Sequence, residues 1–425
     1  MTSTTDIEAP IEVSRAAFSD GFPSDAPIRL LVFADNMGAS QSIAFVEGLA
    51  QARGCGDAAV RIVEEQAFGP DLGLRESPSI RATVLAHIEE TTPTAIVVSR
   101  FGHSTAYDAI AAAAQASGAP LILHIDDQLF ELPATVGVER YRSARHPRRI
   151  HTLHRALVEA DFVIAATEIL ADRLTGLAGH GRIGWLENGA AGRPWPRRPP
   201  KSARDPVVVG YMGSASHGPD LEAIAPALNN ILARSRNVRL ELFGSIARQP
   251  AAGQLPPNVT CHDVVAGDYA AFKARLMSLE WDIGLAPLQI TPSNRCKTAT
   301  KWTEYAEAGI AVIASDIDPY RPMFAADAAF PATVDQWDHA LDRLVSQPGL
   351  RQGLVRSADA LLGSRYSWER LEASLLGLLQ RAVDEALDGL AADQTLGQPA
   401  GLAPERPHLA RHRRRTADGG VILQG

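Results

Sequence analysis

The chain has 425 residues, of which 46% are hydrophobic and 21% are charged, and its formal net charge is -8. Its length exceeds the size at which a single hydrophobic core stops growing, so we expect two domains. The acidic balance argues against a general nucleic-acid binder, because a footprint on a phosphate backbone requires a basic domain. We therefore expect no nucleic-acid partner, and any anion site must be local.

Residues 1–26 are polar and show no sustained periodicity, so we expect them to form a disordered leader. The first 27 residues also lack the basic and apolar regions of a secretory signal. No apolar run is long enough to span a bilayer, so membrane contact is expected to be peripheral. The three cysteines, Cys55, Cys261 and Cys296, are far apart and odd in number. They indicate neither a disulfide framework nor a cysteine-based zinc site, and a reducing, cytoplasmic compartment fits them best.

Residues 27–192 alternate between apolar strand segments and helical segments, which predicts a first α/β domain with a parallel sheet. A helix running to about Ala52 should follow the first strand. Gly38, in the loop between them, is as typical of an ordinary strand-to-helix turn as of a ligand site. The further segments predicted along this domain are strands at 28–34, 59–64, 95–99, 120–125 and 160–166 and a helix at 79–90.

Polar side chains collect where two of these strands end. Arg100 and His103 follow one strand, and His124, Asp126 and Asp127 end another. The carboxyl ends of parallel strands form the crevice in which ligands bind, so we expect these residues to border a ligand site. Two alternatives remain open: the two aspartates cap a helix, or they form a metal site with His124. The metal site is disfavoured because neighbouring residues on a strand point to opposite faces.

The end of the first domain has two compositional features. The basic run 142–149 is more typical of a solvated helix face than of a patch for acidic lipid. Residues 193–205, which follow a Glu187-Asn188-Gly189 turn, include a run rich in proline and arginine, and we interpret them as the interdomain linker.

A second domain is expected at 206–365. Its first strand, 207–211, runs into a G-x-x-G-S loop that contains Gly213 and Ser214. Small residues between a strand and a helix let backbone amides approach a phosphate. This loop is therefore a candidate diphosphate site, although it contains no arginine or lysine of its own.

The stretch 281–315 carries the strongest chemical signal in the chain, with apolar strands at both ends and a helix between them that Gly309 should terminate. Arg295, Lys297 and Lys301 lie at the start of this helix, where cations and free amides favour an anion. Glu304 should lie on the same side of the helix and accept hydrogen bonds from sugar hydroxyls. Taken alone, Lys and Glu at this spacing more often form a solvated salt bridge.

The C-terminal part of the chain is predicted to form a long amphipathic helix at 366–390, with apolar residues at helical spacing from Leu371 to Ala382. Residues 391–425 are rich in Gly, Pro, Gln and Arg and are expected to be a disordered tail.

The motif K-x-x-x-K-x-x-E-Y, followed by A-x-x-G-x-x-V-x-A-S, resembles a signature of the GT-B glycosyltransferases of family 4, the "group 1" type, in their bacterial polysaccharide branch. The residues that match are Lys297, Lys301, Glu304, Tyr305, Ala306, Gly309, Val312, Ala314 and Ser315. Asp126-Asp127 resembles the D-x-D-D element of the same branch, with His124 at its first position. The sequence departs from the wider family at Cys296, where a glutamate is usual eight residues before Glu304.

The resemblance implies two Rossmann-like domains with parallel sheets that face a cleft, and a C-terminal helix that crosses back to the first domain. It implies transfer of a sugar from a nucleoside-diphosphate-sugar donor to a hydroxyl on a glycan, lipid-linked or other acceptor, with retention of configuration, no metal and no cofactor. The setting would be cell-surface polysaccharide or glycoconjugate biosynthesis, in the cytoplasm or at the inner face of the plasma membrane. Glu304 would bind the donor ribose, and Asp126, Asp127, Lys297 and Glu304 would be the catalytic residues. Arg100, His103 and His124 would lie on the acceptor side of the site.

Two alternatives remain open at this point. The first is a UDP-sugar epimerase of the same architecture, which needs no acceptor. The second is a GT-B domain that binds nucleotide or glycan without turnover, a possibility that the cysteine at position 296 keeps open.

Overall fold

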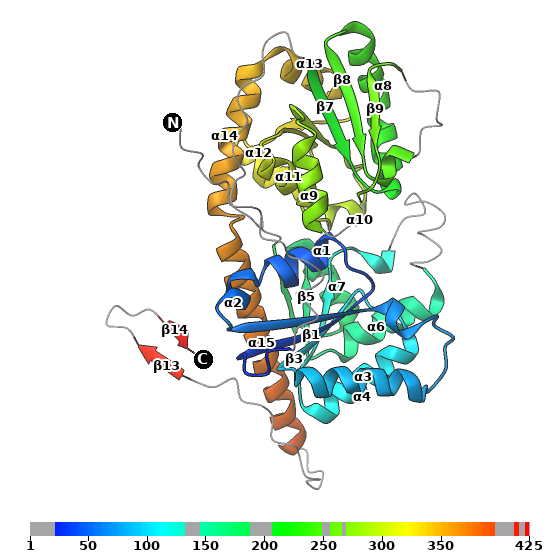
Figure 1. The fold of residues 1–425 in the computed structure, drawn as a ribbon, viewed down its shortest axis with the longest axis vertical. Coiled ribbons are helices and arrows are strands. Elements are labelled where there is room, and N and C mark those ends of the chain that lie inside the picture. The colour runs from blue at the N-terminus through cyan, green and yellow to red at the C-terminus, as the bar shows by residue number, and fades with distance from the viewer. Residues whose placement is uncertain are drawn as a thin grey trace, which may run out of the picture.

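The structure is a computed structural model, and it describes residues 22–131, 145–187, 206–248, 256–265, 269–395, 412–415 and 421–424. Most of the expected leader, the Asn188-Gly189 turn and the expected linker at 193–205 lie outside the described residues. Figure 1 shows two α/β units stacked along the long axis of the molecule.

The first unit contains a six-stranded sheet in the order β2-β1-β3-β4-β5-β6, and every neighbouring pair is parallel. The central strands β3, β4 and β5 are buried at every position, which explains their continuous apolar sequences. The strands are β1 Ile28–Ala34, β2 Ala58–Glu64, β3 Ala95–Ser99, β4 Leu121–Ile125, β5 Phe162–Ala165 and β6 Ile183–Trp185. The main helices between them are α3 Pro78–Thr91, α4 Ser104–Ser117, α6 Pro147–Glu159 and α7 Glu168–Ala178.

The segment after β1 differs from the single helix that the sequence predicts. It consists of the short helix α1 Ala39–Gln41, a π-helical turn Ser42–Glu47 and the helix α2 Ala50–Gly54. The chain passes so close to itself at Gly48 that a Cβ there would lie 2.5 Å from the carbonyl oxygen of Ala44. Glycine therefore permits the π-helical turn, a feature that is frequent at functional sites.

The second unit contains a six-stranded parallel sheet in the order β12-β11-β10-β7-β8-β9. The helix α11 ends before Gly309, whose φ of 69° is the left-handed conformation expected of a terminating glycine. The strands are β7 Val207–Met212, β8 Val238–Phe243, β9 Val259–His262, β10 Ile283–Ala286, β11 Ala311–Ser315 and β12 Phe330–Ala332. The helices are α8 Gly218–Arg234, α9 Tyr269–Ser278, α10 Pro292–Arg295, α11 Thr300–Glu307, α12 Arg321–Ala325, α13 Trp337–Ser346 and α14 Pro348–Ser364.

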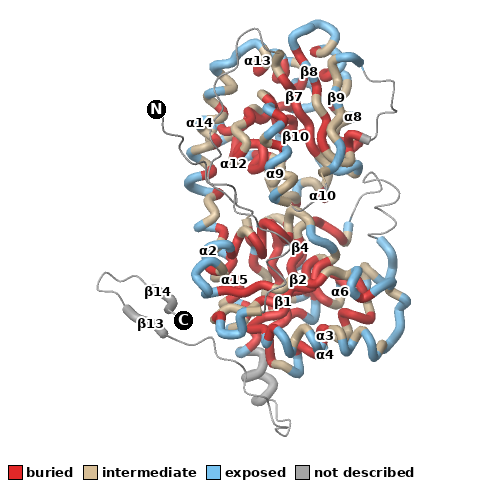
Figure 2. The backbone as a smooth tube through the Cα atoms, viewed as in Figure 1, coloured by how far each residue is buried: buried red, intermediate tan, exposed pale blue. Residues whose placement is uncertain are grey.

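The helix α15 Trp368–Thr395 crosses back to the first unit, as predicted, and continues some residues beyond the predicted end (Figure 1). Its apolar side, including Leu371, Leu375 and Leu378, is buried in one cluster with Leu30 of β1 and Phe162 of β5. Figure 2 shows that the buried residues gather around each of the two sheets. Each unit thus has its own core, and α15 completes the first one.

Two further observations concern the termini and membranes. The part of the chain expected to be a disordered tail contains the end of α15 and an antiparallel pair, β13 His412–Arg415 with β14 Val421–Gln424. Among the described helices, none combines the length and the apolar character needed to cross a bilayer.

Candidate functional site

The two units are in contact where the carboxyl ends of their strands face each other. The Lys297 ammonium lies 3.4 Å from a carboxylate oxygen of Asp127, which follows β4 in the other unit. The Thr167 hydroxyl, at the start of α7, donates to the carbonyl oxygen of Cys296 at 2.9 Å. Cys296 itself is fully buried in the core cluster of the first unit. The loop between β10 and α11 therefore docks on the first domain.

The loop after β7 brings Gly213 and Lys301 together. The Lys301 ammonium donates to the carbonyl oxygen of Met212 at 2.7 Å and lies 5.1 Å from the ring centre of Tyr211. A Cβ at Gly213 would lie 3.6 Å from this ammonium, so the cation is beside the bend of the loop. The loop that lacks a cation in its own sequence thus receives one from α11.

The electrostatic environment of Lys301 favours an anion. Burial lowers the pKa of this lysine to about 8, with Lys297 contributing and the carboxylate of Glu304 opposing the change. In the described part of the chain, no carboxylate lies within 4.0 Å of the ammonium. An anion bound beside it would favour the charged form, because an opposite charge raises the pKa of a lysine.

His217, at the end of the short 3-10 turn Ala215–His217 before α8, also borders this loop. Its Nδ1 lies 3.1 Å from a carboxylate oxygen of Asp220. Burial, followed by the charge of Lys301, lowers the pKa of His217 to about 4. The imidazole is therefore neutral at pH 7, and its single N–H, on Nδ1, donates to the Asp220 carboxylate, which leaves Nε2 as an acceptor.

Glu304 is buried and accepts a hydrogen bond from the Tyr269 hydroxyl at 2.8 Å. Burial raises its pKa to about 7, although Tyr269 and Lys301 act in the opposite direction. Lys301 and Glu304 lie on α11 as expected, whereas Lys297 precedes the helix and points to the other domain. The predicted alignment of all three on one helical side is therefore wrong for Lys297.

A charged cluster that the sequence did not indicate lies behind Glu304. The Lys273 ammonium on α9 lies 3.1 Å from Glu307 and 3.6 Å from Glu47, which ends the π-helical turn of the first domain. Burial raises the pKa of Glu47 to about 7 and also raises the pKa of Glu307. No sequence pattern reveals this cluster, because its members come from both domains.

Asp126 and Asp127 point in different directions, as their adjacency on an extended chain predicts. One oxygen of Asp126 accepts from the Ser40 hydroxyl, and both oxygens lie 3.2 Å from the Arg100 guanidinium. Burial alone would raise the pKa of Asp126, but Arg100 and Ser40 outweigh it and hold the pKa low. Asp126 is thus an internal anion, and Asp127 is the one that faces the second domain.

Arg100 is the centre of a network at the strand ends of the first domain. It has a φ of 53°, an uncommon conformation for a side chain of its size, and its guanidinium lies 3.2 Å from Asp35. Arg149, which sequence reasoning placed on a solvated helix face, also contacts Asp35 at 3.3 Å and Glu65 at 3.2 Å. Burial raises the pKa of Asp35 to about 6, and the two arginines oppose it. The solvated-face interpretation is therefore wrong for Arg149.

The two predicted histidines make core contacts. His124 lies 2.8 Å from the Ser99 hydroxyl and packs edge-on against Phe45, and burial lowers its pKa to about 4. His103 accepts from the amide of Ala106 at the start of α4. An acceptor-side role for either histidine stays a prediction. Among the described residues, no group of three or more His, Cys, Asp or Glu is arranged to hold a metal ion.

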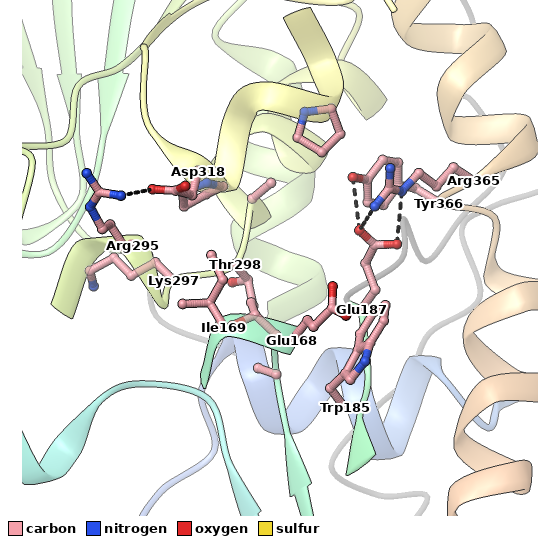
Figure 3. Close-up of a pocket in the computed structure, with 15 residues that line it drawn as sticks. Glu168, Ile169, Trp185, Glu187, Arg295, Lys297, Thr298, Asp318, Arg365 and Tyr366 are labelled. Atoms are coloured by element: carbon pink, nitrogen blue, oxygen red, sulfur yellow. Dashed lines mark hydrogen bonds and ion pairs between the residues drawn. The ribbon is translucent and has the colours of Figure 1, made fainter. Parts of the chain in front are cut away.

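Arg295, the remaining predicted cation, lies 3.2 Å from Asp318 and is about half exposed. Both residues border an open pocket between the domains, with an empty volume of about 630 Å³ that includes space open to solvent. Figure 3 shows this pocket between the Arg295–Asp318 pair on one side and Trp185 and Glu187 on the other.

No protein-family model matches the chain, and no curated protein matches its sequence. Solved structures match its fold. The Anabaena protein Alr3699/HepE, solved in complex with UDP-glucose, has a TM-score of 0.56 and 14% identity, over 83% of this chain and 99% of that chain. WaaG, described as a glycosyltransferase involved in lipopolysaccharide biosynthesis, has a TM-score of 0.53 and 14% identity, over 83% of this chain and 98% of that one.

These matches, together with the two parallel sheets and the returning helix α15, define the class. The chain is an α/β protein of the GT-B fold. At this level of identity the likeness establishes the fold, and the chemistry has to be argued from the site.

Proposed function

We propose that the protein is a glycosyltransferase that uses a nucleoside-diphosphate sugar as donor. The observation that carries the proposal is the position of Lys301, a half-buried cation without a carboxylate at ion-pair distance among the described residues, beside the backbone of Gly213. A lysine in this state is suited to a phosphate. The GT-B fold and the UDP-glucose in the structure of the Anabaena protein support a nucleotide sugar as the ligand.

In this proposal the amides of Gly213 and Ser214 and the Lys301 ammonium bind the diphosphate. Lys297 and Arg295 supply further positive charge from the adjacent loop. Negative charge develops on the phosphate oxygen as the sugar departs, so fixed cations near it stabilise the transition state more than the ground state.

Glu304 binds the hydroxyls of the donor ribose, and the Tyr269 hydroxyl holds its carboxylate in place. On the acceptor side, Asp127 faces the second domain and orients the acceptor hydroxyl. Asp126 and Arg100 position Asp127 by fixing the end of β4. We propose that configuration is retained and that neither a metal nor a cofactor takes part.

The acceptor in this proposal is a glycan or a lipid-linked sugar of cell-surface polysaccharide or glycoconjugate biosynthesis, and the enzyme acts in the cytoplasm, with any membrane contact peripheral. The role stated for WaaG, in lipopolysaccharide biosynthesis, supports this setting.

The test is a thermal-shift screen against UDP, GDP, ADP and their glucose conjugates, performed on the wild type, Lys301→Ala and Arg239→Ala. Arg239 is exposed on β8 and serves as the control. A nucleotide at about a hundred times its dissociation constant stabilises the native state by about 2.7 kcal/mol, which is easily detected. We expect one nucleotide to stabilise the wild type and Arg239→Ala but not Lys301→Ala.

The absence of a shift with every nucleotide would refute the donor site. For the nucleotide that binds, incubation of its labelled sugar conjugate separates transfer from epimerisation. A changed sugar without an acceptor would indicate an epimerase, and binding without any turnover would indicate a scaffold.

A further inference from the structure

The pocket beside Lys297 is formed by both domains. Ala166, Thr167, Glu168, Ile169, Trp185 and Glu187 come from the first domain and line one side. The second domain contributes the loops after β10 and β11, and the start of α15 closes the end with Arg365 and Tyr366 (Figure 3). The pocket therefore lies beside the carboxyl ends of β5, β6, β10 and β11. The donor loop with Gly213 and the Lys301 ammonium lies instead at the end of β7.

The charges that line this pocket balance one another. Three cationic residues, Arg295, Lys297 and Arg365, face three acidic residues, Glu168, Glu187 and Asp318. Arg365 contacts Glu187 at 2.8 Å and 3.0 Å, and Arg295 lies 3.2 Å from Asp318. Cations that already have carboxylate partners attract a phosphate less strongly than Lys301 does, so the balanced lining favours a neutral, polar ligand.

Two features indicate a sugar ring rather than another neutral molecule. Trp185 is 41% exposed at the pocket, and the negative face of an indole attracts the weakly positive C–H face of a pyranose. The pocket also offers several polar groups to the hydroxyls of a sugar. They are the Asp318 carboxylate, held by Arg295 at 3.2 Å and by Arg321 at 3.0 Å, and the paired side chains of Glu187 and Arg365.

We infer that this pocket is a saccharide subsite, separate from the donor site, that binds a neutral sugar unit of the acceptor. The identification of the saccharide as part of the acceptor rests on the proposed function, but the binding itself does not. Glu187 lies near the point where the chain leaves the first domain, and Arg365 lies near the point where it returns through α15. A sugar in this pocket contacts both side chains, so its binding stabilises the arrangement in which the two domains are close.

The test is isothermal titration of the purified full chain with methyl α-glucoside, methyl α-mannoside, methyl β-galactoside and the disaccharide maltose, and separately with UDP. The variants are Trp185→Ala, Trp185→Phe and Leu177→Ala. Leu177, near the end of α7, is an exposed apolar residue that does not line the pocket, and it serves as the matched control. We expect at least one saccharide to bind the wild type and Leu177→Ala, and its affinity to fall at least about tenfold in Trp185→Ala. Trp185→Phe should retain part of the affinity, because it keeps an aromatic face.

Two results would overturn the inference. One is that no saccharide binds the wild type, and the other is that Trp185→Ala binds it as well as the wild type does. The UDP titration distinguishes the two proposals, because Trp185 does not lie at the donor loop. If the affinity for UDP is the same in the wild type and in every variant, the donor site is supported, whether or not a saccharide binds. Saccharide binding without any nucleotide binding would support this pocket and refute the proposed donor site.

Discussion

Asp126 and Asp127 are neighbours in the sequence, but their carboxylates serve different partners. Asp126 is held by Arg100 and Ser40 within the first domain, and Asp127 extends to Lys297 of the second. The proposed mechanism therefore separates their roles, since only Asp127 is in a position to meet an acceptor while a donor is bound.

The variant Asp127→Asn tests this separation. The amide keeps the shape but removes the negative charge that orients the acceptor hydroxyl, so the transfer rate should fall by about tenfold or more. UDP affinity should remain the same or rise, because Lys297 loses its carboxylate partner. Single-turnover kinetics and titration with UDP measure the two effects, and a large loss of UDP affinity would contradict the assignment.

Cys296 occupies the position at which the wider family has a glutamate, and the structure gives a physical reason. Its side chain is fully buried in the apolar core of the first domain, and its carbonyl accepts from Thr167. A carboxylate at this point would lose its water in apolar surroundings, which is costly.

We therefore expect Cys296→Glu to destabilise the protein by at least about 2 kcal/mol. Cys296→Ala, which keeps the site apolar and leaves only a small cavity, should cost about 1 kcal/mol. Chemical denaturation measures both. Equal stability of the Glu variant and the wild type would mean that the loop after β10 leaves the first domain easily.

At the scale of elements, α15 is the helix whose loss should matter most to the first domain. Leu375 is fully buried between this helix and the sheet, whereas Leu387 on the same helix is 46% exposed. The stability of the first sheet thus depends on a segment that comes after the whole second domain in the sequence.

Leu375→Ala should lower the free energy of unfolding by about 2–5 kcal/mol, and Leu387→Ala should change it by less than about 0.5 kcal/mol. Hydrogen exchange on the wild type and both variants locates the effect. Protection should fall in β1 and β5, and a loss confined to the second domain would argue against the packing described.

The elements also mark where sequence reasoning succeeds. Continuous apolar runs and a terminating glycine predict the strands β1 to β5, β7, β10 and β11 and the helices α3, α11 and α15, because burial and backbone conformation are local properties. The proximity of Lys301 to Gly213 also follows from topology. Gly213 follows β7, Lys301 lies in the first turn of α11 after β10, and β7 and β10 are adjacent parallel strands. The π-helical turn and the cluster of Glu47, Lys273 and Glu307 do not follow, because they depend on a close backbone contact and on how the domains dock.

At the scale of the whole molecule, that interdomain cluster predicts a dependence on pH. Glu47 belongs to the first domain and Lys273 and Glu307 to the second. Burial raises the pKa of Glu47 from 4.5 to about 7, so the folded protein holds its proton more tightly than the unfolded chain does. The stabilisation is complete below about pH 4.5 and is lost as the pH rises through about 7.

The melting temperature should therefore decrease as the pH rises from about 5 to about 8. At about 1.4 kcal/mol per pKa unit, Glu47 alone contributes up to about 3 kcal/mol to this change. Glu47→Gln should flatten the profile, and Glu222→Gln, at an exposed site on α8, should leave it as it is. Parallel profiles for the wild type and Glu47→Gln would exclude the cluster as the origin.

The return of α15 also has a consequence for synthesis on the ribosome. The second domain is one continuous segment between β7 and α14, so all of it has emerged before translation reaches the leucines that seal the first sheet. Although the first domain is made first, it cannot close its core until the end of the chain arrives, because Leu371 and Leu375 cover β1 and β5. The nascent protein should therefore complete its domains in the reverse of their order in the sequence, and it exposes one apolar face of the first sheet until then.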